Sequence, residues 1–166
     1  MKILIDSANV EKIKEISKYR EITGITTNPT ILSKVEGDIE NILKELKEFT
    51  YNKYEIHVQT TESEVEGILS EARVLRKFFG ETFHIKIPVT KAGLESIKLC
   101  SREGIKVTAT AVLSPMQALA AAMNGASYVA PYVNRMENVG QDATETISVI
   151  SDLLIDYPTE ILAASF

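Results

Sequence analysis

Lys86 is the residue of this chain best placed for covalent chemistry. It lies in the short run FHIKIPVT, residues 83–90, which Pro88 stops because proline cannot donate a hydrogen bond to a sheet ladder. Side chains alternate along a strand, so His84 and Lys86 share one face and the large apolar side chains share the other. If other strands surround this one, loss of water lowers the pKa of Lys86 and makes its amine a nucleophile for carbonyls. The alternative is a rim lysine whose charged end reaches water.

A polar side chain stands near the C-terminal end of every expected strand. One such residue would mean little, because strand ends meet solvent anyway. In barrels, however, the C-terminal ends of the strands form the catalytic face, and a carboxylate, amides, a lysine and a phenol together indicate a site. Alternation places these residues at that end: Asp6, Thr26, Asn28, Gln59, Lys86, Thr110, Tyr132 and Ser165.

The residues present limit the chemistry. His57, His84 and the single Cys100 are scattered and show no metal-ligand spacing. His57 lacks the serine or cysteine arrangement of acyl transfer, so we interpret it as a packed polar side chain. A metal-free electrophile is then required, and Lys86 can supply it as an iminium ion. An enediol isomerase is disfavoured, because no glutamate is in phase at a strand end.

The neighbouring polar groups suggest supporting roles. Asp6 could exchange a proton with the amine or with a substrate hydroxyl, or it could instead form an ion pair with Lys86 or Arg135. Arg135, expected on a loop, could clamp a substrate phosphate bidentately, the alternative being a solvated surface charge. Three groups could hold one water that shuttles a proton at the carbon–carbon bond: Tyr132, Gln59 and Thr110.

A series of strand–helix units is needed to bring these side chains together. In the sequence such a unit recurs about every 20 to 30 residues. The expected strands are Lys2–Asp6, Thr23–Thr26, Tyr54–Gln59, Phe83–Pro88, Lys106–Val112, Tyr128–Pro131 and Glu160–Ser165. Between them, apolar stripes at helical spacing predict six helices. The helix that carries Val65 and Ile68 is expected to begin with a capping box formed by Ser63 and Glu66.

Seven strands and six helices predict an α/β fold, a (β/α)8 TIM barrel truncated after the seventh strand. We expect residues 1–166 to form a single barrel domain that lacks the last helix–strand–helix portion, since a complete barrel takes ~200 residues or more. The competing fold is an open doubly wound sheet. It should carry a glycine-rich phosphate fingerprint after the first strand, and residues 6–9, DSAN, contain no glycine.

Composition narrows the class of protein. Of the 166 residues, 45% are hydrophobic and 25% charged, which is typical of a soluble globular domain. The net charge of −5 argues against a nucleic-acid or anionic-membrane surface. There is no apolar run of membrane-spanning length and no signal-peptide pattern, and the single cysteine fits a reducing compartment. We therefore expect a cytoplasmic protein without nucleic-acid or membrane partners.

Five motifs follow one another along the whole chain: Asp6, GITTNP at 24–29, KIPVT at 86–90, YVAPYVNR at 128–135 and AASF at 163–166. Together they resemble the small transaldolase/fructose-6-phosphate aldolase family. The resemblance implies a (β/α)8 barrel and class I aldolase chemistry, in which a lysine forms a Schiff base and no metal or other cofactor takes part.

The resemblance also implies roles for individual residues. Lys86 would form the Schiff base with a ketose such as dihydroxyacetone or a sugar phosphate. Asp6 and Asn28 would bind substrate hydroxyls and assist proton transfer, while Arg135 and Ser165 would hold the phosphate. Two further positions belong to the expected substrate-binding set: Thr26 and Ala130.

Two positions separate the activities within that family. Transaldolases tend to have a glutamate where this chain has Gln59 and a phenylalanine where it has Tyr132, and the aldolase branch resembles this chain at both. A tyrosine hydroxyl can act as acid or base toward a bound water, and phenylalanine cannot. We therefore favour cleavage of fructose 6-phosphate into dihydroxyacetone and glyceraldehyde 3-phosphate. Transfer of a dihydroxyacetone unit between sugar phosphates is the alternative.

The sequence departs from the aldolase pattern in two places. Residues 109–114, ATAVLS, lack a glycine before the threonine and a tyrosine after the valine, which leaves the acceptor preference open. The family also continues beyond Phe166 for about a fifth to a quarter of its length, through an eighth strand and helices. We expect either a fragment of a longer product or a barrel closed by another chain, hence a homo-oligomer. A catalytically incomplete fragment is the alternative of another class.

Overall fold

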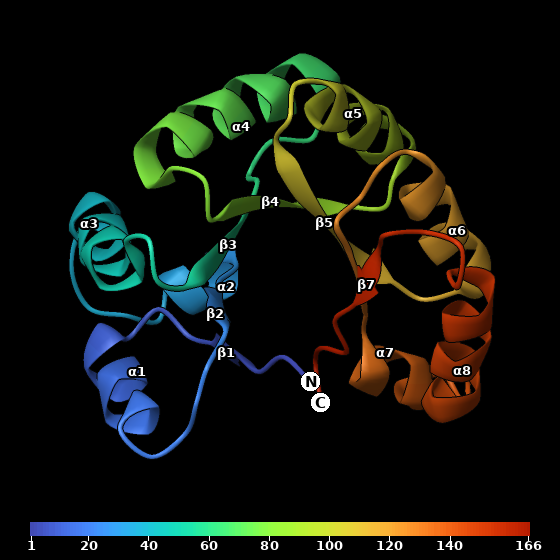
Figure 1. The fold of residues 1–166 in the computed structure, drawn as a ribbon, viewed down its shortest axis with the longest axis horizontal. Helices are drawn as coiled ribbons and strands as arrows, with labels where there is room; N and C mark the ends of the chain where they lie inside the picture. The colour runs from blue at the N-terminus through green and yellow to red at the C-terminus, as the bar shows by residue number, and fades with distance from the viewer.

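The computed structural model describes residues 1–166 and contains one parallel sheet that curls into an incomplete barrel (Figure 1). The seven strands are hydrogen-bonded in chain order, from β1 to β7. This order is that of a barrel and not of a doubly wound sheet, so the predicted fold class is confirmed. The strands are β1 (Leu4–Asp6), β2 (Gly24–Thr26), β3 (Glu55–Gln59), β4 (Phe83–Pro88), β5 (Lys106–Val112), β6 (Tyr128–Pro131) and β7 (Glu160–Ile161).

Helices connect successive strands and cover the outer side of the sheet (Figure 1). No helix is long and apolar enough to cross a membrane. The helices are α1 (Val10–Ser17), α2 (Pro29–Leu32), α3 (Ile39–Thr50), α4 (Val65–Phe79), α5 (Lys91–Arg102), α6 (Pro115–Met123), α7 (Val133–Asn138) and α8 (Ala143–Leu153).

The two edge strands, β1 and β7, face each other across the open side of the ring, near both chain termini (Figure 1). They do not pair through their backbones. Side-chain contacts span the opening, because Lys2 Nζ lies 2.6 Å from Glu160 Oε1 and 2.6 Å from the hydroxyl of Tyr128. The edges are therefore joined by an ion pair and not by a ladder, so both retain free backbone groups.

The two faces of the sheet differ in character, as strand alternation requires. Side chains that point outward from the strands pack against the helices, and many are completely buried, including Ile25, Ile56, Ile85, Val107 and Val129. They belong to one core cluster of 29 buried residues. Cys100 of α5 is part of this cluster. The opposite face, inside the barrel, carries the polar side chains.

Several local expectations from the sequence are wrong. The seventh strand ends at Ile161 and not at Ser165, and the chain has eight helices and not six. The segment Val133–Asn138 is the helix α7, so Arg135 lies on a helix and not on a loop. Helix α4 begins at Val65 after Glu64, and no side chain caps its first turn, so the expected capping box is absent. Ser63 lies one residue before the position from which a capping hydroxyl would reach the third amide of the helix.

Candidate active site

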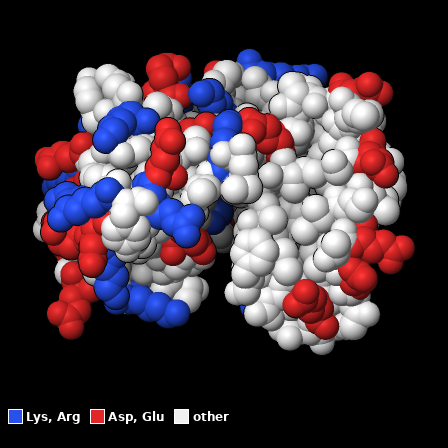
Figure 2. Space-filling view, turned by 60° about the horizontal axis from the view of Figure 1, so that its bottom comes forward, with Lys and Arg blue, Asp and Glu red and all other residues white.

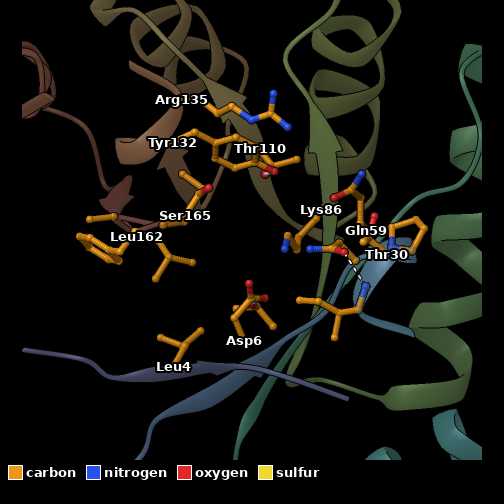
Figure 3. A pocket seen from close by; sticks show the side chains of 18 of the residues that line it. Leu4, Asp6, Thr30, Gln59, Lys86, Thr110, Tyr132, Arg135, Leu162 and Ser165 are labelled. Carbon is orange, nitrogen blue, oxygen red and sulfur yellow. Dashed lines mark hydrogen bonds between the residues drawn. The ribbon is translucent and has the colours of Figure 1, made fainter. Parts of the chain in front are cut away.

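The C-terminal ends of the strands surround a cavity of about 720 Å3 (Figure 3). All ten residues proposed from the sequence line it, which is what strand alternation predicts for the inside of a barrel. They come from β1, β2, β3, β4, β5, β6 and the segments that follow β2, β6 and β7: Asp6, Thr26, Asn28, Gln59, Lys86, Thr110, Ala130, Tyr132, Arg135 and Ser165.

Lys86 projects into this cavity from β4, between Gln59 on one side and Thr110 on the other in the view of Figure 3. The residue is only 6% exposed, and its Nζ donates a hydrogen bond to the carbonyl oxygen of Thr27 at 2.8 Å. Burial lowers the pKa of Lys86, and the negative charge of Asp6 opposes that shift only in part. The rim-lysine alternative is therefore wrong, and the amine lies where it meets a ligand in the cavity.

Asp6 ends β1 directly opposite Thr26 of β2 in the ladder register. The hydroxyl of Thr26 donates to Asp6 Oδ1 at 2.5 Å, which fixes the carboxylate toward the cavity. Asp6 forms no ion pair with Lys86 or Arg135 within 4.0 Å. The carboxylate is thus free to meet a substrate hydroxyl, and the ion-pair alternative is not realised in this structure.

Thr110 and Tyr132 form a pair on the far side of Lys86 from Gln59 (Figure 3). Their hydroxyl oxygens lie 2.9 Å apart, within hydrogen-bond distance. The ladder between β5 and β6 shifts register between Ala109 and Val112, and Ala111 has a φ of 57°. A left-handed backbone is uncommon for alanine, and such residues gather at functional sites. The bulge re-aims the strand where Thr110 enters the cavity.

The two residues expected to hold phosphate, Arg135 and Ser165, come from segments that contact each other beside the cavity. Arg135 is exposed on α7, and Ser165 lies in the last residues of the chain. The amide of Asn134 donates to the carbonyl oxygen of Ser165 at 2.8 Å, which keeps the two segments together. Ser165 has a φ of 59°, again left-handed. Arginine and serine side chains beside a cavity suit an anionic oxygen cluster.

Asn28 serves two purposes at the end of β2. Its Oδ1 accepts a hydrogen bond from the amide of Ile31 at 2.9 Å and so caps α2. The side-chain NH2 group of Asn28 and the second lone pair of its Oδ1 remain available to a ligand. Pro29 occupies the first helical position and holds this cap close to the cavity.

Further residues line the cavity beyond the ten proposed from the sequence. Lys34 follows α2 and supplies a further cation at the wall near Asn28. Leu4 on β1 and Leu162 after β7 supply apolar walls on either side of the open edge. Figure 2 shows the hollow between two halves of the surface, with charged side chains denser over the N-terminal half. Lys34 lies after a short helix, where no periodic pattern exists.

Three comparisons identify similar proteins. A family model described as Transaldolase/Fructose-6-phosphate aldolase matches residues 3–166. A probable transaldolase of Nitrosopumilus maritimus is 39% identical over 168 residues, which cover 99% of this chain and 74% of that protein. A probable fructose-6-phosphate aldolase of Streptococcus pneumoniae is 42% identical over 171 residues, which cover 100% of this chain and 76% of that protein.

Solved structures with low sequence identity show the fold alone. An enolase, a putative galactarate dehydratase from Agrobacterium radiobacter, superposes with a TM-score of 0.68 at 11% identity, over 99% of this chain and 45% of the other. A putative fructose-1,6-biphosphate aldolase from Coccidioides immitis gives 0.62 at 13% identity, over 96% of this chain and 64% of the other. Both likenesses agree with a barrel-type arrangement of the strands.

Proposed function

The chain belongs to the transaldolase/fructose-6-phosphate aldolase family, and from this premise we propose that it makes or cleaves a carbon–carbon bond through a Schiff base on Lys86. The observation that carries the proposal is the buried amine of Lys86, which opens into a 720 Å3 cavity of polar side chains. A neutral amine in such surroundings adds to a carbonyl, and the other polar groups can orient a polyhydroxylated substrate.

The reaction begins at the ketone of the sugar. Lys86 Nζ adds to the carbonyl carbon, and the carbonyl oxygen leaves as water after it gains two protons, one of them from the amine. The product is an iminium ion, which draws the electrons of the adjacent carbon–carbon bond toward nitrogen. Asp6, close enough to raise the pKa of Lys86, is positioned to exchange a proton with the amine or with a substrate hydroxyl.

Bond cleavage also requires a proton to leave the hydroxyl of the departing aldehyde half. A water held by Tyr132, Thr110 and Gln59 accepts that proton as the bond breaks and the enamine forms. The same water then protonates the enamine carbon, and hydrolysis of the resulting iminium releases dihydroxyacetone and regenerates the amine. In the transaldolase alternative, the enamine instead attacks the carbonyl carbon of a second aldehyde.

We favour fructose 6-phosphate cleavage over transfer between sugars. The phenol of Tyr132 is bonded to Thr110 beside the cavity, and Gln59 stands on the other side of Lys86 without a charge of its own. An acid/base hydroxyl in this position favours protonation of the enamine by water and thus its release as a free ketone. Both names occur among the relatives, so the transaldolase reaction is the second candidate.

Reductive trapping tests the covalent step directly. The chain is incubated with dihydroxyacetone and borohydride, and the intact mass is measured and the adduct mapped. One adduct on Lys86 is expected, absent from Lys86→Met and retained in Lys91→Met, a control at an exposed lysine. An unmodified chain, or an adduct elsewhere, rules out the proposal and leaves the catalytically incomplete fragment as the better account.

A turnover assay then separates the two reactions. Fructose 6-phosphate alone is sufficient for an aldolase, whereas a transaldolase needs an added aldose phosphate as acceptor. We also propose that the enzyme acts in the cytoplasm on sugar phosphates of carbohydrate metabolism, and that it works as a homo-oligomer. Analytical ultracentrifugation of the 166-residue chain tests the last point, because a monomer at micromolar concentration contradicts it.

A further inference from the structure

The only two histidines of the chain meet inside the barrel, at the end opposite the cavity that contains Lys86. His57 of β3 and His84 of β4 are direct partners in the ladder register. Their rings stack with centroids 4.3 Å apart and planes inclined by 8°. Glu55 precedes His57 by two residues, so its side chain points to the same face of β3.

These three residues offer a nitrogen, a nitrogen and a carboxylate oxygen, and the candidate ligand atoms all lie within 4.8 Å of one another. We propose that Glu55, His57 and His84 bind a divalent transition-metal ion such as Zn2+ at the N-terminal end of the barrel. Two imidazoles and one carboxylate form a common protein donor set for zinc, with a water in the fourth position.

Hydrogen bonds already orient both imidazoles. The Nδ1 atom of His84 lies 3.2 Å from the carbonyl oxygen of Thr82, and since a carbonyl can only accept, Nδ1 carries the proton. The Nε2 atom of His84 therefore presents its lone pair and makes no hydrogen bond. The Nε2 atom of His57 lies 3.3 Å from Glu55 Oε2, so without a metal Nε2 carries the ring proton and donates it to the carboxylate, while Nδ1 accepts from the hydroxyl of Thr108 at 2.8 Å. For Nε2 to bind a metal the ring proton must move to Nδ1, where Thr108 can turn to accept it, an arrangement typical of metal-binding histidines.

The carboxylate of Glu55 has several polar neighbours. Its Oε2 lies 2.9 Å from the hydroxyl of Tyr128 and 3.3 Å from Nε2 of His57. Lys2 Nζ lies 3.5 Å from Glu55 Oε1 but 2.6 Å from Glu160 Oε1, so Lys2 is held mainly by Glu160. A cation at the cluster therefore competes with only a long contact from Lys2 to Glu55. The rings of His57 and His84 are buried beside this carboxylate.

The site needs a local adjustment to hold an ion. In a tetrahedral site, Zn–N bonds of ~2.1 Å place two ligand atoms ~3.4 Å apart, so a pair at the 4.8 Å limit must approach by roughly 1.4 Å. Glu55, whose side chain is 23% exposed, can supply part of this movement, and the nearly parallel imidazole rings must turn until both Nε2 lone pairs point at the ion. A cavity of about 510 Å3 adjoins the cluster at Lys2, Tyr128 and Glu160 and gives an ion a path from solvent.

The proposed ion has a structural role, not a catalytic one. It would join β3 to β4 at their N-terminal ends, below the layer that contains Lys86 and Gln59. Barrel sites that face this end contribute to stability and not to turnover. Removal of the metal is therefore expected to lower the melting temperature without reducing Schiff-base trapping on Lys86.

Zinc titration of the full chain tests the inference. After chelation and dialysis, ZnCl2 is added and binding is followed by calorimetry and by long-range 1H–15N NMR of the imidazoles. One Zn2+ per chain is expected, with shifts of the ring nitrogens of both His57 and His84. Because the chain has no other histidine, an imidazole signal has only these two sources.

Single substitutions test which side chains bind the Zn2+ ion. His84→Gln is expected to weaken Zn2+ binding at least 100-fold, and Thr108→Val, which removes only the orienting hydroxyl, ~10- to 100-fold. Lys2→Met is expected to tighten binding, because the competing ammonium is gone. Glu66→Gln, at an exposed carboxylate on α4, leaves the affinity unchanged.

The inference is overturned if the unaltered chain binds no Zn2+, or binds it without any change at the two imidazoles. Equal affinity in folded His84→Gln also overturns it. If that variant does not fold, the imidazole signals of the unaltered chain decide alone. None of these outcomes depends on the Schiff-base trapping that tests the proposed function.

Discussion

Lys86 donates its one hydrogen bond to the main-chain carbonyl of Thr27, across the intervening strand β3. A carbonyl oxygen accepts a hydrogen bond from either protonation state of the amine, so this bond positions the nitrogen without fixing its charge. Burial lowers the pKa of Lys86 and so favours the neutral amine, whose lone pair can add to a carbonyl carbon. The bond to Thr27 thus holds the nucleophile in the cavity.

The pH dependence of Schiff-base trapping follows from this environment. Burial lowers the pKa of Lys86 below its ordinary value of 10.5. The rate of borohydride trapping with dihydroxyacetone is expected to rise with pH through that lowered pKa and to level off before exposed lysines deprotonate. A profile whose midpoint coincides with 10.5 would contradict the burial argument.

Asp6→Asn shifts that profile in a defined direction. The negative charge of Asp6 raises the pKa of Lys86, so its removal lowers the pKa further and moves the trapping midpoint to lower pH. Trapping reports imine formation and not turnover, so a catalytic role of Asp6 does not obscure the shift. A control at an exposed acid, Glu66→Gln, leaves the midpoint in place. A trapping midpoint at higher pH in Asp6→Asn would contradict the inference that the charge of Asp6 raises the pKa of Lys86.

The lowered pKa of Lys86 also makes the stability of the fold depend on pH. Between the lowered pKa of folded Lys86 and 10.5, the unfolded chain binds more protons, so the free energy of unfolding increases with pH in that window. Lys86→Met removes this dependence. Urea titrations of both proteins across the window measure it, and parallel pH profiles would show that the lysine does not titrate there.

Tyr132→Phe separates imine formation from cleavage. The substitution removes the phenol that is bonded to Thr110, so proton transfer at the carbon–carbon bond loses its acid/base group. Cleavage of fructose 6-phosphate is expected to fall ~10²- to 10⁴-fold, while trapping of dihydroxyacetone on Lys86 persists. Tyr19→Phe, at an exposed tyrosine on the surface, serves as the control. Equal losses of trapping and cleavage would show that Tyr132 acts on binding alone.

Arg135→Met tests whether Arg135 binds the phosphate group of the substrate. Loss of a charge-assisted hydrogen bond costs about 1.5–3 kcal/mol, so KM for fructose 6-phosphate is expected to rise ~10- to 100-fold. Trapping of dihydroxyacetone, which has no phosphate, is expected to be unchanged. Lys34→Met provides a comparison at the second cation of the cavity. If both variants raise KM equally, the anion binds between Lys34 and Arg135 and not at α7.

Strand alternation was sufficient to place the interior polar residues, because a period of two determines which side chains share a face. In the sequence Gln59 is in phase with His57, and Lys86 with His84. In the structure Gln59 and Lys86 are direct ladder partners. Helix α7 was missed because its six residues bury only Met136 and so form no apolar stripe. The first turn of α7 is held by the hydrogen bond from the amide of Asn134 to the carbonyl oxygen of Ser165. Ser165 is distant from α7 in the sequence, so a local pattern does not reveal this contact.

The histidine cluster could not be found from spacing. Metal-ligand motifs rely on residues a few positions apart on one element, whereas His57 and His84 belong to different strands. Their stacking depends on the register between β3 and β4, which follows from the helix α4 that joins the strands and from the outward packing of both. Alternation along each strand predicts which face each histidine occupies. It does not predict that the two histidines lie at the same level along the barrel axis.

The outward side of β4 is expected to set the stability of the strand that carries Lys86. Ile85 is completely buried between the sheet and the helices, with its neighbours Phe83 and Ile87 equally enclosed. Ile85→Ala is expected to lower the free energy of unfolding by about 2–5 kcal/mol, the sum of lost burial and the cavity left behind. Val74→Ala on α4, at a side chain that is 64% exposed, should cost less than ~0.5 kcal/mol. Urea denaturation measures both, and a loss at position 85 no larger than that at 74 would mean that β4 is not held by the core described.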